Sequence, residues 1–135
     1  IIQADQIKEV EKVNTEKLYF IDAVPYSSIF PYVRGVVHHG GCTTNGLSLL
    51  YGCPTLVIPL ALDQYFYGRM DNRLGAGPAP LYIRKKLCTT EQIESALLDL
   101  VSGQYDEAAR EISAKIQREN GVVCAADAIE KYVRG

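Results

Sequence analysis

The stretch Val36–Gln64, VVHHGGCTTNGLSLLYGCPTLVIPLALDQ, contains a complete strand–turn–helix–strand pattern. It begins with a short apolar strand and continues through the pair Gly40-Gly41 and a run of small hydroxylated residues. A second apolar run, 55–59, follows the helix, and an acid–amide pair closes the stretch. A strand, a glycine turn and a helix in this order direct the first amides of the helix at a bound anion. The stretch therefore predicts an anion-binding turn.

The rest of the chain continues this alternation. The apolar runs 18–21, 35–38 and 55–59 lack a period of two, which favours parallel strands covered on both faces. Helices are expected over residues 44–51, 65–74, 90–103, 105–120 and 124–133. The order predicts right-handed βαβ units in an α/β domain, with a Rossmann-like parallel sheet flanked by helices and a single domain over residues 1–135.

The composition excludes several classes of protein. A formal net charge of −2 argues against a nucleic-acid partner, because such proteins normally carry a basic excess. The sequence has no apolar run near the roughly 20 residues of a transmembrane helix. The four cysteines form no Cys-x-x-Cys pair, which favours free thiols in a reducing compartment and a cytoplasmic location.

Four short motifs resemble a known family signature. His-His-Gly-Gly at 38–41, Thr-Thr at 43–44, Gly-Cys-Pro at 52–54 and Asp-Gln at 63–64 resemble the donor-binding stretch of UDP-sugar glycosyltransferases with the GT-B fold. The likeness is greatest to sterol glucosyltransferases and to relatives that glycosylate antibiotic aglycones. It implies the C-terminal half of a GT-B fold that is truncated at its N-terminus. The first strand and helix of that half and the acceptor domain would precede Ile1.

The glycine turn is the expected diphosphate site. Both glycines let the backbone approach a ligand, and the hydroxyls and amides after them can bond an oxyanion. The resemblance places the second histidine against the diphosphate and leaves His38 with a structural role. The expected diphosphate-binding residues are His39, Gly40, Gly41, Thr43, Thr44 and Asn45.

The acid–amide pair is the expected sugar site. Asp63 and Gln64 follow the second strand at its carboxyl end, where open α/β sheets bind ligands, and the family uses this pair to bond sugar hydroxyls. A helix N-cap is the alternative for Asp63. By the same resemblance Val24 and Tyr26 would hold uridine, mostly through backbone atoms.

The sequence departs from the family at two positions. The family has a small residue and then a glycine between His-His-Gly-Gly and Thr-Thr, whereas this chain has only Cys42, which we expect to be a small buried packing residue. Leu47 stands where plant relatives have a ribose-binding glutamate. We therefore expect diphosphate binding with altered detail, and uridine specificity follows from the family alone.

The resemblance implies a hexosyltransferase that moves a hexose, with glucose as the expected sugar, from UDP to a lipid or sterol hydroxyl with inversion. No catalytic residue is expected in this chain, since the family's general base is a histidine of the N-terminal domain. No cofactor and no metal are expected, which agrees with the lack of an Asp-x-Asp motif. The full-length protein could lie peripherally at membranes. The alternatives are a donor-binding subunit of a two-chain transferase, a UDP-sugar epimerase and a non-catalytic binding module.

Overall fold

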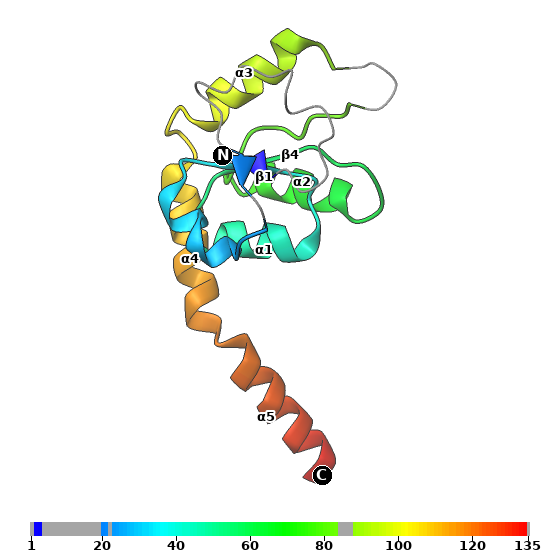
Figure 1. Ribbon diagram of the computed structural model, residues 1–135. Coiled ribbons are helices and arrows are strands. Elements are labelled where there is room, and N and C mark those ends of the chain that lie inside the picture. The colour runs from blue at the N-terminus through cyan, green and yellow to red at the C-terminus, as the bar shows by residue number, and fades with distance from the viewer. Residues whose placement is uncertain (1, 4–19, 22, 84–87, 135) are drawn as a thin grey trace.

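A computed structural model describes residues 2–3, 20–21, 23–83 and 88–134 of the chain (Figure 1). The predicted surface segment at 5–15 and the first part of the predicted strand at 18–21 lie outside these ranges. The strands within these ranges are β1 (Ile2–Gln3), β2 (Phe20–Ile21), β3 (Val36–His38) and β4 (Thr55–Val57). The helices are the 3-10 turns η2 (Tyr26–Ser28) and η3 (Phe30–Tyr32) and the α-helices α1 (Cys42–Leu50), α2 (Gln64–Arg73), α3 (Thr90–Leu100), α4 (Asp106–Glu119) and α5 (Gly121–Arg134).

The strands form two parallel pairs. β1 pairs with β2, and β3 pairs with β4 in the register Val36–Thr55, Val37–Leu56 and His38–Val57. The connection between β3 and β4 is α1, as the sequence predicts for a βαβ unit. The expected parallel α/β arrangement is therefore present, but within the described residues the strands make two small sheets and not one.

β4 is the centre of the fold. Its three residues are almost completely buried, and its far edge is covered by the chain that follows α2. There the Thr55 amide donates to the Ala76 carbonyl at 2.9 Å, and the Leu81 amide donates to the Val57 carbonyl at 3.0 Å. Gly77 makes this close approach possible, because a Cβ on it would collide with the Thr55 carbonyl.

β3, in contrast, is paired on one edge only within the part of the chain that the structure describes. Its bonds to β4 come from Val36, whose amide donates to Pro54, and from His38, whose carbonyl accepts from Ile58. The main-chain groups of Val37 therefore point away from β4, and no described strand pairs with them. The Val37 side chain is 44% exposed. The prediction that both strands are covered on both faces is thus confirmed for β4, whereas the Val37 side chain of β3 is partly exposed.

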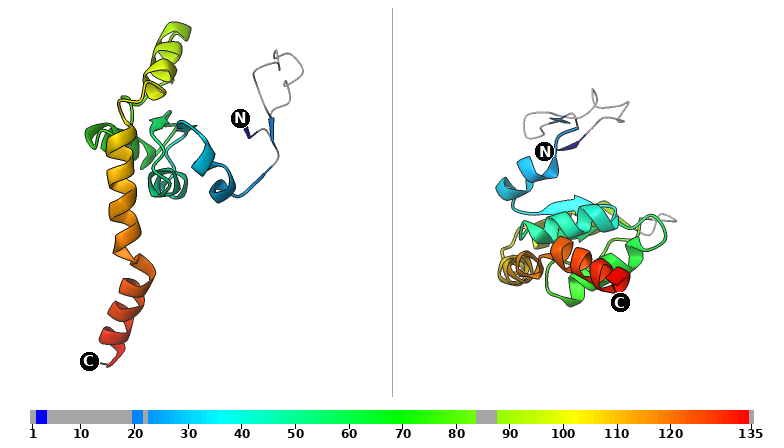
Figure 2. Two further views of the ribbon diagram at one scale, coloured as in Figure 1. Left: turned by 90° about the vertical axis from the view of Figure 1, so that its left-hand side faces the viewer. Right: turned by 90° about the horizontal axis from the view of Figure 1, so that it is seen from below.

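The helices surround β4 unequally. α1 and α3 lie on opposite sides of β4 in Figure 1, and α1 contacts both α2 and α4. α4 packs on α1 through buried Ala109 and through Ser113, whose hydroxyl donates to the Leu50 carbonyl at 2.6 Å. α3 starts with a capping box between Thr89 and Gln92. Figure 2 shows α5 extending away from the rest of the molecule.

The helix boundaries differ from the predicted ones in instructive ways. α1 begins at Cys42, two residues before the predicted start, because Gly41 and not a hydroxylated residue is its N-cap. α4 ends at Glu119, its C-cap Asn120 adopts the left-handed conformation (φ 45°), and Gly121 is the first residue of α5. Asparagine is the residue after glycine that best tolerates this conformation.

Candidate functional site

The two halves of the predicted site lie in direct contact at the carboxyl ends of β3 and β4. Gly40 follows β3 and adopts a φ of +89°, which favours glycine. A Cβ at this position would lie 2.6 Å from Val57 Cγ1 and 3.1 Å from the Gln64 carbonyl oxygen. The glycine turn before α1 therefore packs on the end of β4 and on the first residue of α2. This contact brings the predicted diphosphate and sugar residues to one edge of the sheet.

The His39 ring lies over the start of α1. A Cβ on Gly41 would come within 2.5 Å of His39 Nε2, so this ring nitrogen lies beside the N-cap of the helix. The side chain is exposed. An imidazole at a helix N-terminus can donate to the same oxyanion that the first amides of the helix bind.

His38 has a different, structural environment, as the sequence indicates. Its Nδ1 accepts from the Gly40 amide at 2.9 Å, and its Nε2 lies 3.4 Å from Ser48 Oγ. Since Nδ1 accepts, the ring proton is on Nε2 and points to Ser48, whose hydroxyl donates to the Thr44 carbonyl at 2.8 Å. Burial and, secondarily, the charge of His39 lower the pKa of His38 to about 4. The neutral ring thus connects the glycine turn to the first turn of α1.

Three polar residues in the first turn of α1 were predicted to bind diphosphate, and they are not equivalent. Thr43 is exposed and Thr44 is half-buried, so both can be reached from solvent. Asn45 is 1% exposed; its amide donates to the Gly41 carbonyl and its Nδ2 donates to Asp71 Oδ1 at 3.2 Å. The prediction for Asn45 is corrected here, because this side chain belongs to the core between α1 and α2.

Asp71 anchors that core contact. Its carboxylate accepts from Asn45 and, at 3.0 Å, from the Thr55 hydroxyl of β4. Burial raises the pKa of the Asp71 carboxyl, and the two hydrogen bonds partly offset this effect. The network fixes α1, β4 and α2 relative to one another, and therefore also fixes the two helix starts that carry the site.

Asp63 and Gln64 lie where the sequence predicts, but their side chains have different freedom. Asp63 is exposed and precedes α2, yet in the described chain its carboxylate makes no capping bond to that helix. Asp63 is thus the N-cap residue by position, as the alternative has it, but its side chain does not cap the helix and is exposed. Gln64 Oε1 accepts from the amides of Leu60 and Ala61 at 2.7 and 2.9 Å. Only the NH2 group of this amide remains available, as a donor.

The residues predicted to bind uridine lie farther from the glycine turn than the other predicted site residues do. Val24 lies beyond the carboxyl end of β2, in the other pair of strands, and is exposed. The Tyr26 ring stacks on Phe30 with centroids 4.9 Å apart, and Phe30 in turn contacts Tyr51 at the C-terminal end of α1. The Tyr26 side chain thus joins an aromatic cluster at the other end of α1 from His39. A uridine contact at this position would have to come from the backbone.

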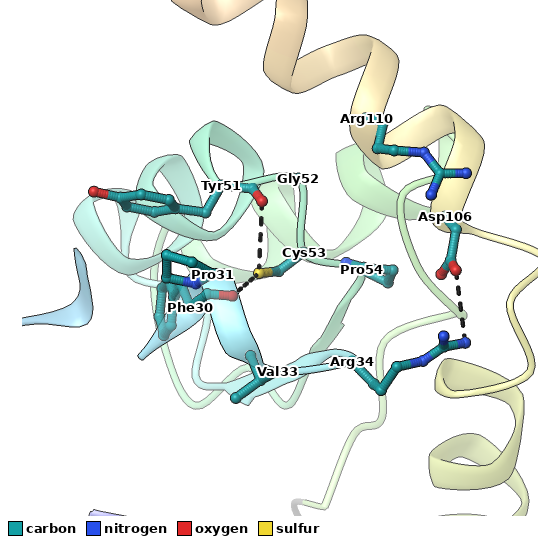
Figure 3. A pocket seen from close by; sticks show the side chains of 10 residues that line it. All are labelled: Phe30, Pro31, Val33, Arg34, Tyr51, Gly52, Cys53, Pro54, Asp106 and Arg110. Carbon is teal, nitrogen blue, oxygen red and sulfur yellow. Dashed lines mark hydrogen bonds and ion pairs between the residues drawn. The ribbon is translucent and has the colours of Figure 1, made fainter. Parts of the chain in front are cut away.

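A pocket of about 250 Å³ lies at the opposite edge of the sheet, where β3 and β4 begin (Figure 3). Arg34 and Asp106 pair across it at 3.6 Å, and Cys53 donates to the Phe30 carbonyl at 3.0 Å. Burial raises the pKa of the Cys53 thiol, which opposes a reactive thiolate there. Ligands of open α/β sheets bind at the carboxyl ends of the strands, so this pocket is distinct from the candidate site.

Sequence reasoning missed two features of the site. Cys42 was expected to be buried but is exposed, because it is the first residue of α1 and its amide is among those without an intrahelical partner. Leu62 has a φ of +51° and is 89% exposed immediately before Asp63. A proline-bounded turn signals a loop here, but no pattern in the sequence signals a left-handed leucine.

Comparison with known proteins agrees with this geometry. The C-terminal domain family of erythromycin biosynthesis protein CIII-like proteins matches residues 1–130. The chain belongs to this family. The domain is 37% identical over 123 residues to the terpene cyclase–glycosyl transferase fusion protein fsoA of Humicola fuscoatra, covering 84% of this chain and 9% of that protein. It is 30% identical over 118 residues to sterol 3-beta-glucosyltransferase UGT80B1 of Arabidopsis thaliana, covering 87% and 19%.

Solved structures confirm the predicted fold. Spinosyn forosaminyltransferase SpnP superposes with a TM-score of 0.76 at 20% identity, over 87% of this chain and 31% of that chain. The glycotransferase of kitacinnamycin gives a TM-score of 0.71 at 24% identity, over 84% and 29%. The domain therefore has the α/β architecture of the GT-B glycosyltransferases. It spans less than a third of the length of any of these four relatives.

Proposed function

We propose that the domain binds the UDP-sugar donor of an inverting glycosyltransferase, and that the protein moves a hexose, namely glucose, to a lipid or sterol hydroxyl. The observation that carries the proposal is the contact between Gly40 and the first residue of α2. This contact places the start of α1, which suits a diphosphate, close to the exposed carboxylate of Asp63, which suits a sugar. Family membership supports the reaction class, and the names of several relatives favour a sterol acceptor.

The diphosphate lies at the start of α1 in this proposal. The amides of the first helical turn, the Thr43 and Thr44 hydroxyls and His39 Nε2, which lies beside the helix N-cap, are the proposed donors. Each hydrogen bond to a charged phosphate contributes about 1.5–3 kcal/mol, and the helix dipole adds about 0.3–2 kcal/mol. These donors hold the diphosphate without a metal ion. They also stabilise the negative charge that develops on it as the sugar departs.

The hexose lies between that region and the start of α2. The Asp63 carboxylate accepts from two neighbouring sugar hydroxyls, and the Gln64 NH2 group donates to another. Gln64 holds the loop in front of Asp63 through its bonds to Leu60 and Ala61, so the sugar-binding carboxylate is placed before the donor arrives. The base that deprotonates the acceptor comes from outside this domain.

The proposal is tested by calorimetric titration of the chain with UDP and with UDP-glucose, in buffer containing EDTA. We expect weak binding of both ligands. Asp63→Ala removes the two bonds to sugar hydroxyls, so it should weaken UDP-glucose by roughly tenfold or more and leave UDP within about twofold.

Asp127→Ala is the matched control, because Asp127 is an exposed aspartate on α5. It should change neither affinity. Failure of both nucleotides to bind would disprove the proposed donor site. Equal weakening of UDP and UDP-glucose by Asp63→Ala would disprove the sugar contact.

A further inference from the structure

The loop between β4 and α2 presents apolar side chains on both sides of Asp63. Leu60 is 47% exposed, Leu62 is 89% exposed and Phe66, in the first turn of α2, is 58% exposed. Asp63, which is also exposed, stands between them in the chain, so exposed apolar side chains flank the residue to which the proposed function assigns the sugar.

The backbone conformation of Leu62 is unfavourable for a leucine. Its φ of +51° lies in the left-handed region, which costs an ordinary side chain free energy that glycine or asparagine largely avoids. Its side chain contributes almost nothing to the core, since 89% of it is exposed. A strained residue that packs on almost nothing among the described residues suggests a contact with something else.

The loop that carries Leu62 is fixed. Gln64 Oε1 accepts from the amides of Leu60 and Ala61 at 2.7 and 2.9 Å, and the Phe66 amide donates to the Asp63 carbonyl at 2.9 Å. The backbone on each side of Leu62 is thus held in place, so the side chain projects from a defined position beside Asp63.

We infer that Leu62, with Leu60 and Phe66, binds the apolar aglycone next to the transferred sugar. This inference rests on the proposed function, and it assigns an apolar acceptor to the same site. In the transfer step the acceptor oxygen forms a bond to the anomeric carbon, the bond to UDP breaks, and the acceptor proton passes to the base. The aglycone is then joined directly to the sugar that Asp63 holds, so the residues flanking Asp63 are the ones it meets.

The test uses product-like ligands and the chain itself. The chain saturated with UDP is titrated with methyl, hexyl and octyl β-D-glucoside, each below its micelle concentration. In the wild-type chain, octyl glucoside should bind at least about tenfold more tightly than methyl glucoside, because several methylene groups leave water. Leu62→Asn keeps the left-handed turn and removes the apolar side chain, so it should reduce this ratio by roughly threefold or more without weakening methyl glucoside.

Leu98→Asn is the control, because Leu98 is an exposed leucine on α3; it should leave the ratio unchanged. The inference is overturned if affinity does not rise with alkyl length, or if both asparagine variants lower the ratio equally. UDP and methyl glucoside would still bind in those cases, so the donor site would stand. Absence of binding by UDP and by every glucoside would overturn the donor site and the inference together.

Discussion

At the residue scale, the glycine turn contains two glycines with different reasons to be glycine. Gly40 has a positive φ, and a side chain there would collide with Val57 and Gln64, so the folded structure requires glycine at this position. Gly41 has an ordinary φ of −64°, and only the His39 ring opposes a side chain there. The first glycine therefore serves the fold, whereas the second leaves room for the imidazole at the start of α1.

Gly41→Ala should consequently separate binding from folding. The added Cβ displaces His39 Nε2, so UDP affinity should fall by roughly tenfold, the value of one lost hydrogen bond to a charged group, while thermal stability changes little. Gly46→Ala is the control: a Cβ there meets nothing within 4 Å, and the exchange inside α1 should stabilise the chain by about 0.5–1 kcal/mol. Calorimetry and thermal unfolding on both variants check this, and unchanged UDP affinity in Gly41→Ala would contradict it.

His38 predicts a pH dependence of stability. Its pKa falls from 6.5 in the unfolded chain to about 4 in the folded one, so between these values the unfolded chain binds more protons. Stability from the neutral ring is complete above pH 6.5 and is lost as the pH falls towards 4, by up to roughly 3 kcal/mol. Denaturant unfolding at several pH values should show this loss.

His38→Asn isolates the contribution of His38. The asparagine carbonyl can still accept from the Gly40 amide but does not titrate, so the wild-type chain should lose more stability than this variant between pH 6.5 and 4. The comparison is needed because burial also raises the pKa of the Asp71 carboxyl, and stability from that group changes in the opposite direction. Parallel pH curves for the two chains would refute the assignment.

At the element scale, α1 and α2 are joined by a buried polar contact and not by apolar packing alone. Asp71 accepts from Asn45 of α1 and from Thr55 of β4. Asp71→Ala leaves these buried donors without a partner and opens a cavity, so it should destabilise the chain by about 2–4 kcal/mol. Chemical denaturation measures the change. Asp71→Asn, which keeps the shape, should cost less; equal losses in both variants would mean that packing and not hydrogen bonding holds the helices.

Much of the arrangement of helices and strands could be predicted from the sequence. The parallel βαβ unit, the position of α2 within one residue and the adjacency of the two halves of the site all follow from apolar runs, glycines and known strand-end chemistry. Whether an individual polar side chain is buried or exposed cannot be predicted from these patterns. Thr44 and Asn45 are neighbouring polar residues, and the sequence does not distinguish them. The helix begins after an N-cap at Gly41, and this start places the Asn45 side chain on the buried face of α1.

The same limit applies to the loop before α2. Gln64 was expected to bond a sugar with its whole amide, yet its Oε1 is used by two backbone amides of the loop. Such local competition between side chain and backbone depends on the turn geometry, which residue order alone does not fix. The backbone of Leu62 could not be predicted for the same reason.

At the scale of the whole molecule, α5 contributes little to the folded domain. Every described residue from 121 to 134 is exposed, and both figures of the full chain show the helix projecting from the rest. Removal of residues 121–135 should therefore shift the Tm by less than about 2 °C. A variant that also lacks α4 should fail to fold cooperatively, since it loses buried Ala109 and the Ser113 bond to Leu50. Thermal unfolding followed by circular dichroism tests both, and a large Tm loss on removal of α5 would show that it packs on the domain.

None of the helices in the described ranges has both the length and the apolar character needed to cross a bilayer.

The edge of β3 that no described strand covers has a practical consequence for handling the chain. The amide and carbonyl of Val37 point outward beside an apolar side chain, which makes the strand a template for any extended polypeptide nearby. Two copies can satisfy these groups on each other, so we expect the isolated chain to self-associate and precipitate increasingly as it is concentrated. A lysine in place of Val37 would add a repelling charge to that border while leaving the bonds to β4 intact.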